Sequence, residues 1–292
     1  MTEPLDERVR RAQVLVEALP YIRRFHGQIL VIKLGGAAME AAESRDAVLQ
    51  DVVLLRYVGM RPVLVHGGGP AISHLSRQLG LEPRFVDGLR VTDAATMEVA
   101  KMVLTGKITP DLVAALHRLG GRAMGLSGED GPTLLVRPRT GSGGQDLGFV
   151  GEVVQVNPDP LLALLDQGLI PVVASIGLGY DGQSYNVNAD TVAAELAVAL
   201  GAGKLLLLTD VEGVRDADDA LCSVLSPAAA QALVQARVVR DGMVPKVEAA
   251  LRAAAAGVRA HIIDGRQPHA ALLELLTEEG IGTMVEPVGA PT

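Results

Sequence analysis

Short apolar runs alternate with stretches of helical periodicity along most of this 292-residue chain. Runs of strand length occur at 29–32, 62–65, 170–174, 205–208 and 261–263. Helical spacing of apolar positions occupies 45–58, 70–79, 94–119, 189–200, 227–236 and 244–256. Because strands and helices alternate, the pattern predicts an α/β fold with a mainly parallel sheet covered by helices on both faces.

The middle of the chain departs from this alternation. Two short strand patterns, 134–136 and 148–156, are separated by the turn sequence Thr140-Gly-Ser-Gly-Gly144 and predict a β-hairpin. A second turn-rich stretch, 177–182, lies between two runs of α/β pattern. We therefore expect two closely coupled lobes, 28–178 and 179–292.

The first 27 residues form a separate element. Apolar residues recur at nearly helical spacing over 6–25, with arginines on the other face, which predicts an amphipathic helix before the first strand. Pro20 falls inside this pattern and predicts a kink or a break into two pieces.

Composition narrows the function classes. The net charge of −8, from 26 Lys and Arg against 34 Asp and Glu, argues against non-specific nucleic-acid binding. An aromatic content of 2% without Trp argues against base stacking. No apolar run approaches the roughly 18 residues of a membrane span, and the start lacks the features of a secretory signal, so a cytoplasmic location is expected. The lone Cys222 excludes an intrachain disulfide and a cysteine zinc site, and a half-buried position is expected for it.

Two glycine clusters follow predicted strands. Gly35-Gly36 comes after the first strand and Gly67-Gly68-Gly69 after the second. Either cluster alone could be a structural turn, but turns at the carboxyl ends of parallel strands also bind anions. Together with Lys33, they predict a site for a substrate carrying phosphate and carboxylate. Their spacing fits neither a Walker A loop nor Gly-x-Gly-x-x-Gly.

Three charged residues occupy unusual local positions. Lys33 ends an apolar strand, where burial of an ammonium requires an anion, although the side chain could instead reach solvent. Lys246 lies in the first turn of a predicted helix, where the dipole disfavours a cation unless an anion is near. Asp190 follows Asn188, a candidate helix cap, and is ambiguous by itself. The histidines 66, 117 and 261 lie in or beside apolar elements and are expected to be structural.

Six segments resemble, in order, the motifs of the N-acetylglutamate kinases within the amino acid kinase family. They are Val31-Ile-Lys-Leu-Gly-Gly36, Val65-His-Gly-Gly-Gly-Pro70, Gly88-Leu-Arg-Val-Thr-Asp93, Asn186-Val-Asn-Ala-Asp190, Leu208-Thr-Asp-Val-Glu-Gly-Val214 and Gly242-Met-Val-Pro-Lys246. The resemblance extends from about residue 28 to 285. It implies a three-layer αβα sandwich with an amino-terminal acyl-amino-acid lobe and a carboxy-terminal ATP lobe.

The resemblance also implies residue roles. Lys33 and Lys246 would contact the transferred phosphoryl group and Asp190 would hold both lysines, while the amides of Gly36 and Gly68 would receive the developing charge. The substrate set would be Gly68, Gly69, Arg90 and Asn186, with Arg90 on the α-carboxylate. The ATP set would be Gly35, Gly36, Thr209, Asp210 and Gly213. Mg²⁺ would be held mainly by phosphates and water, and no protein ligand is assigned to it.

The implied reaction is ATP-dependent phosphorylation of the γ-carboxylate of N-acetyl-L-glutamate in arginine biosynthesis. One alternative is a kinase of an amino-blocked α-aminoadipate, one methylene longer. Another is a non-catalytic arginine sensor on the same fold, which Lys33, Asp190 and Lys246 argue against. Composition alone supports only a small-molecule binding module. Glu129 departs from the family pattern, in which Lys is common, and leaves the charge contacts of that loop open.

The carboxy-terminal segment 269–283 resembles the arginine site of the arginine-inhibited members. By that resemblance Glu274 would bind the guanidinium, Gly280 would offer carbonyls, and Tyr21 and Lys204 would approach from the first helix and the ATP lobe. The first helix would interlace dimers into a hexamer, a trimer of dimers. The alternative is an ordinary amphipathic helix followed by an edge strand.

Overall fold

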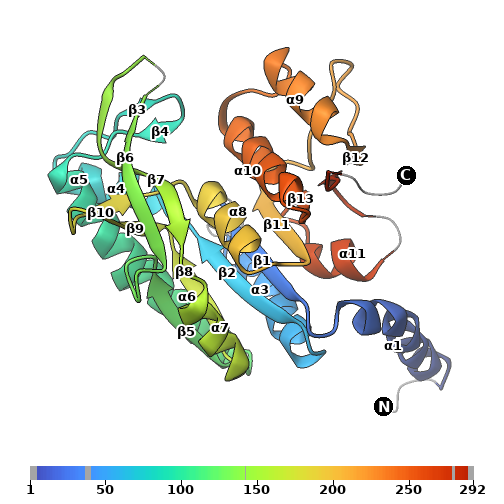
Figure 1. Ribbon diagram of the computed structural model, residues 1–292. Helices are drawn as coiled ribbons and strands as arrows, with labels where there is room; N and C mark the ends of the chain where they lie inside the picture. The colour runs from blue at the N-terminus through green and yellow to red at the C-terminus, as the bar shows by residue number, and fades with distance from the viewer. Residues whose placement is uncertain (1–4, 37–40, 142, 278–279, 289–292) are drawn as a thin grey trace.

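The computed structural model describes residues 5–36, 41–141, 143–277 and 280–288 (Figure 1). Its centre is an eight-stranded sheet in the order β12-β14-β13-β11-β1-β2-β8-β5. These strands are β1 (Ile29–Leu34), β2 (Arg61–His66), β5 (Ala123–Ser127), β8 (Ile170–Ala174), β11 (Lys204–Thr209), β12 (Val224–Leu225), β13 (Arg259–Asp264) and β14 (Thr283–Val285). Every neighbouring pair is parallel except β13 and β14, so the predicted mainly parallel sheet is confirmed.

Helices cover both faces of this sheet, as Figure 1 shows. The helices are α1 (Leu5–Phe25), α3 (Ala42–Tyr57), α4 (Gly69–Gln78), α5 (Ala94–Val103), α6 (Thr109–Arg118), α7 (Asp159–Asp166), α8 (Ala189–Ala199), α9 (Pro227–Gln235), α10 (Val244–Ala255) and α11 (Ala270–Leu276). Alternate residues of each strand enter opposite cores. Val31 and Leu205 pack with α7, α8 and α10, whereas Leu30 and Leu206 pack with α3, α6 and α11. The fold is therefore the expected three-layer αβα sandwich.

A small barrel stands beside one end of the sheet. The predicted hairpin is present as β6 (Leu134–Thr140) and β7 (Asp146–Val156), which pair antiparallel. The hairpin closes into a four-stranded barrel with β9 (Ile176–Gly179) and β10 (Ser184–Asn186). The predicted lobe boundary at residue 178 falls within β9.

The stretch expected as one helix over 94–119 has an irregularity in its middle. Asp93 caps α5, because its Oδ1 accepts a hydrogen bond from the Thr96 amide at 2.8 Å. Between α5 and α6 the chain forms one π-helical turn, Leu104–Ile108. Such turns accommodate one extra residue in a helix and are common at functional sites.

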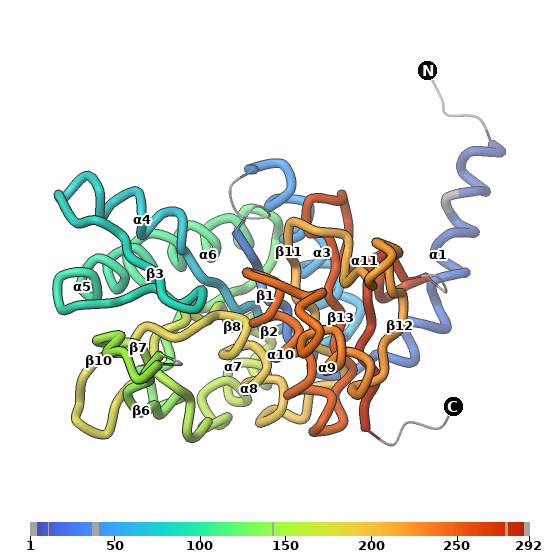
Figure 2. The backbone as a smooth tube through the Cα atoms, turned by 90° about the horizontal axis from the view of Figure 1, so that it is seen from above, coloured from blue at the N-terminus to red at the C-terminus, as the bar shows by residue number. Residues whose placement is uncertain are grey.

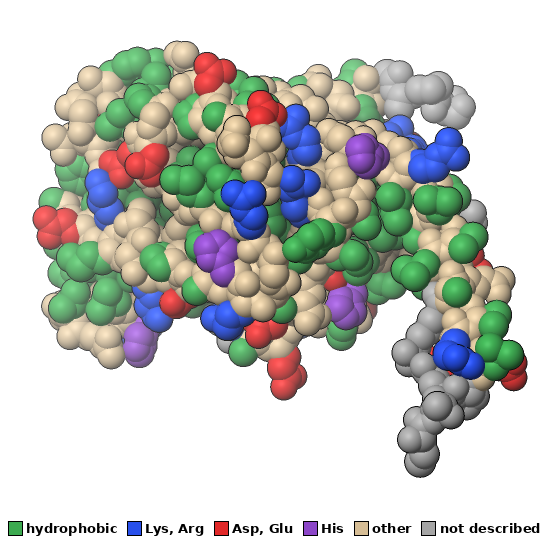
Figure 3. All heavy atoms as spheres, turned by 90° about the horizontal axis from the view of Figure 1, so that it is seen from below, with side chains coloured by type: hydrophobic (Ala, Val, Ile, Leu, Met, Phe, Trp, Pro, Cys, Tyr) green, Lys and Arg blue, Asp and Glu red, His purple; other side chains and the backbone are tan. Residues whose placement is uncertain are grey.

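The first helix projects from the body (Figure 2). It is continuous over Leu5–Phe25 with Pro20 inside, so of the predicted kink or break the break into two pieces is wrong, since one missing amide donor does not stop the flanking turns from continuing. The kink stays a prediction. The carboxy-terminal end of α1 is anchored, where Phe25 is buried and Tyr21 packs against the same core. Farther out, Leu15 and Val16 are 72% and 67% exposed, and Figure 3 shows apolar side chains along this arm. None of the helices in the described part of the chain is long and apolar enough to cross a membrane.

Candidate active site

The two glycine turns meet at one edge of the sheet. They follow β1 and β2, which are adjacent and parallel, so their carboxyl ends lie side by side. Both turns line a cavity of about 530 Å³. The rest of its wall includes the segment around Arg90, the π turn, and the segment that leads into α8.

The two predicted lysines converge on one carboxylate. Lys33 Nζ lies 2.8 Å from Asp190 Oδ1, and Lys246 Nζ lies 3.6 Å from Asp190 Oδ2. Lys33 is the last residue but one of the buried strand β1, Asp190 lies in the first turn of α8, and Lys246 lies in the first turn of α10. Asn188 caps α8 as expected, since its side chain accepts from the amides of Asp190 and Thr191. The alternative of a solvent-reaching Lys33 is wrong, because the residue is 6% exposed.

The charges of this group are strongly coupled. Burial by itself would raise the pKa of Asp190, but the attraction of Lys33 and Lys246 outweighs it and holds the pKa below its usual value. Burial lowers the pKa of Lys246, and repulsion from Lys33 adds to that, while Asp190 opposes it. Two cations around one anion leave an excess positive charge at the cavity wall. The group therefore favours a further anion beside the lysines.

Gly35 and Gly68 are placed where a side chain would not fit. A Cβ on Gly35 would lie 2.4 Å from the Leu208 carbonyl oxygen and 3.1 Å from Lys33 Nζ. A Cβ on Gly68 would lie 2.5 Å from Ile108 Cδ1. Both glycines thus allow a close approach of backbone to neighbouring groups.

Arg90 is carried by a short hairpin, β3 (Phe85–Val86) and β4 (Leu89–Arg90). Asp87 and Gly88 have φ of 51° and 76°, as a two-residue type I′ turn requires. Arg90 Nη2 donates to the Gly69 carbonyl and to Ser73 Oγ, each at 2.8 Å. The guanidinium carbon lies 4.8 Å from the centroid of the Phe85 ring.

One end of the Arg90 guanidinium is free for a ligand. Its buried Nη1 has no hydrogen-bond partner, and the residue lines the cavity. Burial lowers the pKa of Arg90, with a smaller contribution from Arg77, yet an arginine remains charged. An unpaired buried donor on a cation is suited to a carboxylate, which can accept from it.

Asn186 also faces this cavity. It ends β10 in the barrel, where it pairs with Ile176 and Val150. Its amide nitrogen lies 3.4 Å from Thr92 Oγ1, a long contact that leaves the amide available to a ligand. Gly69, Arg90 and Asn186 are thus brought together with the lysines.

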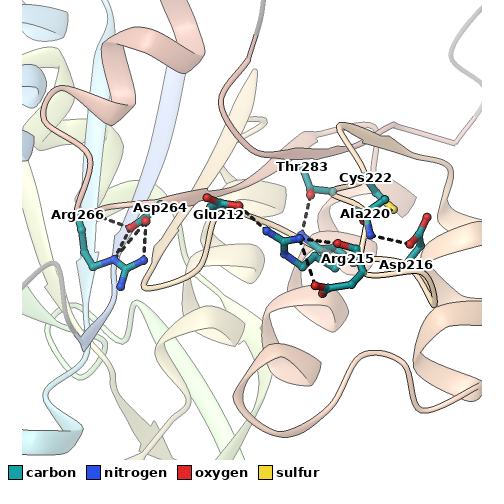
Figure 4. A network of polar contacts seen from close by, with 10 residues as sticks. Glu212, Arg215, Asp216, Ala220, Cys222, Asp264, Arg266 and Thr283 are labelled. Carbon is teal, nitrogen blue, oxygen red and sulfur yellow. Dashed lines mark hydrogen bonds and ion pairs between the residues drawn. The ribbon is translucent and has the colours of Figure 1, made fainter.

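The predicted ATP residues beyond the glycine turns lie outside this cavity. Thr209 ends β11, and its hydroxyl donates to Asp210 Oδ1 at 3.1 Å. A Cβ on Gly213 would lie 2.5 Å from Thr283 Oγ1, so this glycine allows close packing of its loop against β14. Figure 4 shows the polar network here, in which Arg266 binds Asp264 and Arg215 binds Glu212.

Several cavity residues were missed from the sequence. Arg45 of α3, Lys107 of the π turn and Ser175 all line it. Lys107 forms an ion pair with Asp111 at 3.1 Å, and both residues are largely exposed. A π turn at 104–108 would have indicated that Lys107 lies near a functional site. The sequence did not reveal this turn, because the apolar positions on both sides follow a regular helical spacing.

The loop with the unusual Glu129 has its own partners. Glu129 accepts from Lys101 Nζ at 3.0 Å and from the Ser184 hydroxyl. The acidic residue is therefore balanced by a lysine on α5, and the loop stays joined to the barrel. The lone Cys222 is half-buried, as expected.

The predicted regulatory residues gather at the base of α1. Glu274 accepts from the Ile281 amide at 2.8 Å and from buried His261, and a Cβ on Gly280 would lie 2.9 Å from both of its oxygens. Lys204 Nζ lies 5.0 Å from the centroid of the Phe25 ring and is attracted by Glu274. The space beside Lys204 is only about 10 Å³. Glu278 and Glu279 of this segment lie outside the described residues.

Lys204 should make stability depend on pH. Burial lowers its pKa to about 8, so the unfolded chain binds more protons between pH 8 and the ordinary pKa of 10.5. Its contribution to the free energy of unfolding therefore rises with pH over that interval. We expect the free energy of unfolding of Lys204→Met to exceed that of the natural chain at pH 7. This difference in free energy should be smaller at pH 9.5.

Urea unfolding midpoints at the two pH values would measure this difference. Lys107→Met, which replaces a 70% exposed side chain, is the matched control and should show no such narrowing. If the stability difference between Lys204→Met and the natural chain were equal at both pH values, the pKa of Lys204 would not be lowered by burial.

Comparison with known proteins agrees with this arrangement. The sequence pattern of the amino acid kinase family matches residues 28–264. An acetylglutamate kinase from Syntrophomonas wolfei subsp. wolfei is 52% identical over 281 residues, covering 95% of this chain and 97% of that protein.

Solved structures share the architecture. N-acetylglutamate synthase from Neisseria gonorrhoeae, complexed with coenzyme A and N-acetyl-glutamate, superposes with a TM-score of 0.86 at 30% identity. That match covers 96% of this chain, which spans 64% of the synthase's length. Carbamate kinase from Giardia lamblia bound to AMP-PNP is 18% identical, with a TM-score of 0.66 over 89% of this chain and 99% of that one, and supports the fold alone. The family match and the extent of identity establish that this chain belongs to the amino acid kinase family.

Proposed function

We propose that this kinase transfers the γ-phosphoryl group of ATP to the γ-carboxylate of N-acetyl-L-glutamate, a step of arginine biosynthesis. The 52% identical acetylglutamate kinase supports this substrate. The observation that carries the chemistry is the position of Asp190 between Lys33 and Lys246, at the wall of a cavity that also holds the glycine turns and Arg90. A non-catalytic sensor would not need that group.

The reaction needs charge neutralisation more than proton transfer. The substrate carboxylate is already ionised at neutral pH, so no general base is required. One carboxylate oxygen attacks the γ-phosphorus, the bond from phosphorus to the bridging oxygen breaks, and ADP leaves with that electron pair. Lys33 and Lys246 would neutralise the phosphoryl oxygens during transfer, and Asp190 would hold the ammonium groups in place. The amides of Gly36 and Gly68 would add hydrogen bonds to the same charge.

Replacing any member of this group should reduce turnover. We expect Lys33→Ala, Lys246→Ala and Asp190→Ala each to lower kcat at least about a hundredfold, because stabilisation of the transition-state charge is lost. Coupled measurement of ADP formation gives kcat, and circular dichroism checks that each variant is folded. Near-normal turnover in a folded variant would refute the role of that residue.

Arg90 would bind the α-carboxylate of the acyl amino acid. Its free Nη1 points to this role, and Gly69 and Ser73 hold the opposite edge of the guanidinium. Asn186 would bind the acetamido or carboxylate end. An amino-blocked α-aminoadipate has the same groups and one more methylene, which a pocket discriminates by only about 1–3 kcal/mol. Turnover of the two acids separates these substrates.

Arg90→Ala should act mainly on substrate affinity. The α-carboxylate keeps its charge throughout the reaction, so the contact stabilises ground state and transition state alike. We expect the KM for N-acetylglutamate to rise while kcat changes little, and the KM for ATP to stay the same. An unchanged KM for the acyl amino acid would place the carboxylate contact elsewhere.

The nucleotide would lie across the carboxyl ends of β1 and β11. Gly35, Gly36, Thr209, Asp210 and Gly213 are proposed for its site, and residues 28–178 and 179–292 as the acyl-amino-acid and ATP lobes. The metal would arrive as the MgATP complex, with phosphates and water as its ligands. The described residues contain no cluster of three His, Cys, Asp or Glu that could hold a metal ion. As a consumer of ATP, the enzyme is assigned to the cytoplasm.

We also propose inhibition by L-arginine and a hexamer, a trimer of dimers. The exposed apolar residues of α1, among them Leu15 and Val16, need a partner surface in water. Glu274, Gly280, Lys204 and Tyr21 would surround the guanidinium. Because the space at Lys204 is only about 10 Å³, arginine must favour an arrangement in which this region is more open.

Removal of the first helix should separate catalysis from regulation. We expect the full chain to be a hexamer inhibited by arginine, and a variant lacking residues 1–26 to be an active dimer that is insensitive to arginine. Sedimentation and assays with millimolar arginine test both parts. A full-length dimer indifferent to arginine would end this proposal and leave the kinase assignment intact.

A further inference from the structure

His66 and Thr109 form a buried polar contact next to the second glycine turn. His66 ends β2 directly before Gly67, and both side chains are buried. The His66 Nε2 atom lies 2.8 Å from Thr109 Oγ1, and His66 Nδ1 lies 3.1 Å from the Gly67 carbonyl oxygen. None of the roles assigned above uses this contact.

Thr109 begins α6, directly after the π turn. Its amide and its hydroxyl both reach the Leu104 carbonyl oxygen, the hydroxyl at 2.8 Å, and so close the turn. Its methyl group packs against β5, where a Cβ on Gly125 would lie 2.2 Å from Thr109 Cγ2. The hydroxyl thus faces His66 and Leu104, while the methyl group has a separate packing role.

The glycine turn lies directly on this π turn. A Cβ on Gly68 would lie 2.5 Å from Ile108 Cδ1 and 2.8 Å from Leu104 Cδ2. The two side chains that begin and end the π turn therefore support the backbone of Gly68. Any shift of the turn changes where the Gly68 amide points.

The imidazole serves as a fixed hydrogen-bonding group. Burial lowers the pKa of His66 to about 4, so the ring is neutral at the pH of turnover and carries a single N–H. It donates either to the Gly67 carbonyl or to the Thr109 hydroxyl. The Thr109 hydroxyl has a single hydrogen, which it donates to the Leu104 carbonyl when it accepts from His66 Nε2–H, so this tautomer joins the ring to the π turn. In the other tautomer, the hydroxyl would donate to Nε2, and only the Thr109 amide would still bond Leu104.

We infer that His66 and Thr109 are positioning residues for phosphoryl transfer, whose hydrogen bond fixes the Gly67–Gly69 turn on the π turn and so aims the Gly68 amide. The inference rests on the proposed role of that amide in receiving the developing charge. A contact that matters in the transition state affects kcat more than substrate binding. A donor displaced by a fraction of an ångström loses much of its effect on the rate.

Two substitutions separate the hydrogen bond from packing. Thr109→Val keeps the methyl group against Gly125 and removes the hydroxyl, whereas Thr109→Ser keeps the hydroxyl and removes the methyl group. We expect Thr109→Val to lower kcat about tenfold, with both KM values and the Kd of ADP within about twofold of the natural chain. Thr109→Ser should restore kcat to within about twofold, even if it unfolds at a lower temperature.

Thr133→Val is the matched control. Thr133 is also buried and donates its hydroxyl to a backbone carbonyl, but that carbonyl belongs to Asp130 in the loop before β6 and not to the π turn. It should keep its kcat. The ratio of kcat between Thr109→Val and the natural chain should be constant from pH 6 to 8, because a ring that stays neutral exchanges no proton there.

Natural kcat in folded Thr109→Val would overturn the inference, as would equal losses in the Val and Ser variants or a ratio that changes with pH. Lys33→Ala is assayed alongside. If both Lys33→Ala and Thr109→Val turn over normally, the proposed site is wrong. If only Thr109→Val does, the site stands and the positioning role fails.

Discussion

The interaction on which the site depends is the contact of two lysines, Lys33 buried and Lys246 half-buried, with one buried carboxylate. Lys33, Lys246 and Asp190 come from β1, α10 and α8, and each is 14% exposed or less at its side chain. Removing ammonium groups from water is costly unless an anion compensates. A single carboxylate neutralises only one of the two cations. The site keeps a net positive charge that a bound anion can neutralise. The contact between Asp190 and the lysines therefore holds β1, α8 and α10 together and also provides a site for an anionic ligand.

The parallel sheet explains why such a group can form here. Parallel strands end at the same edge, so the turns after β1 and β2, the end of β11 and the starts of α8 and α10 all face one side of the molecule (Figure 1). Helix amino ends and free backbone amides add partial positive charge at that edge. The fold thus concentrates anion-binding groups before any side chain is considered, and Lys33 and Arg90 add full charges with defined directions.

Much of this arrangement could be predicted from the sequence, because its signals are local. Apolar runs correctly predicted strands at β1, β2, β8, β11 and β13. The candidate cap Asn188 correctly indicated where α8 begins. The convergence of Lys33 and Lys246 on Asp190 came from family resemblance, since residues so far apart in sequence are joined only by tertiary packing. The π turn and the short strand β12 were missed, because their hydrogen bonds and partners leave no periodic pattern in the local sequence. A strand after α11, where β14 lies, was expected only in the alternative interpretation of 269–283. At Pro20 the helix continues, although the rule that proline interrupts a helix predicted a kink or a break.

A physical connection between the base of α1 and the active site runs through α3. Asp51, buried in the middle of α3, accepts from His269 Nδ1 at 2.7 Å. Burial raises the pKa of its carboxyl, and the contact with His269 and the nearby amides of Ala271 and Leu272 at the start of α11 partly offset that rise. One turn and a half earlier on the same helix, Arg45 lines the catalytic cavity. Breaking the Asp51 contacts would leave a buried carboxylate without partners, so α11 and α3 are expected to move together.

A ligand that displaced α11 would therefore carry α3 with it and shift Arg45 relative to the glycine turns. This gives the proposed regulation a mechanical basis in a helix of 16 residues that packs as one unit against the sheet. The same contacts limit the size of the change, since the residues of α3 that enter the core cannot slide without opening cavities. Regulation through this route would have to switch between two packed arrangements of α3 and α11, each of which keeps the contact between Asp51 and His269.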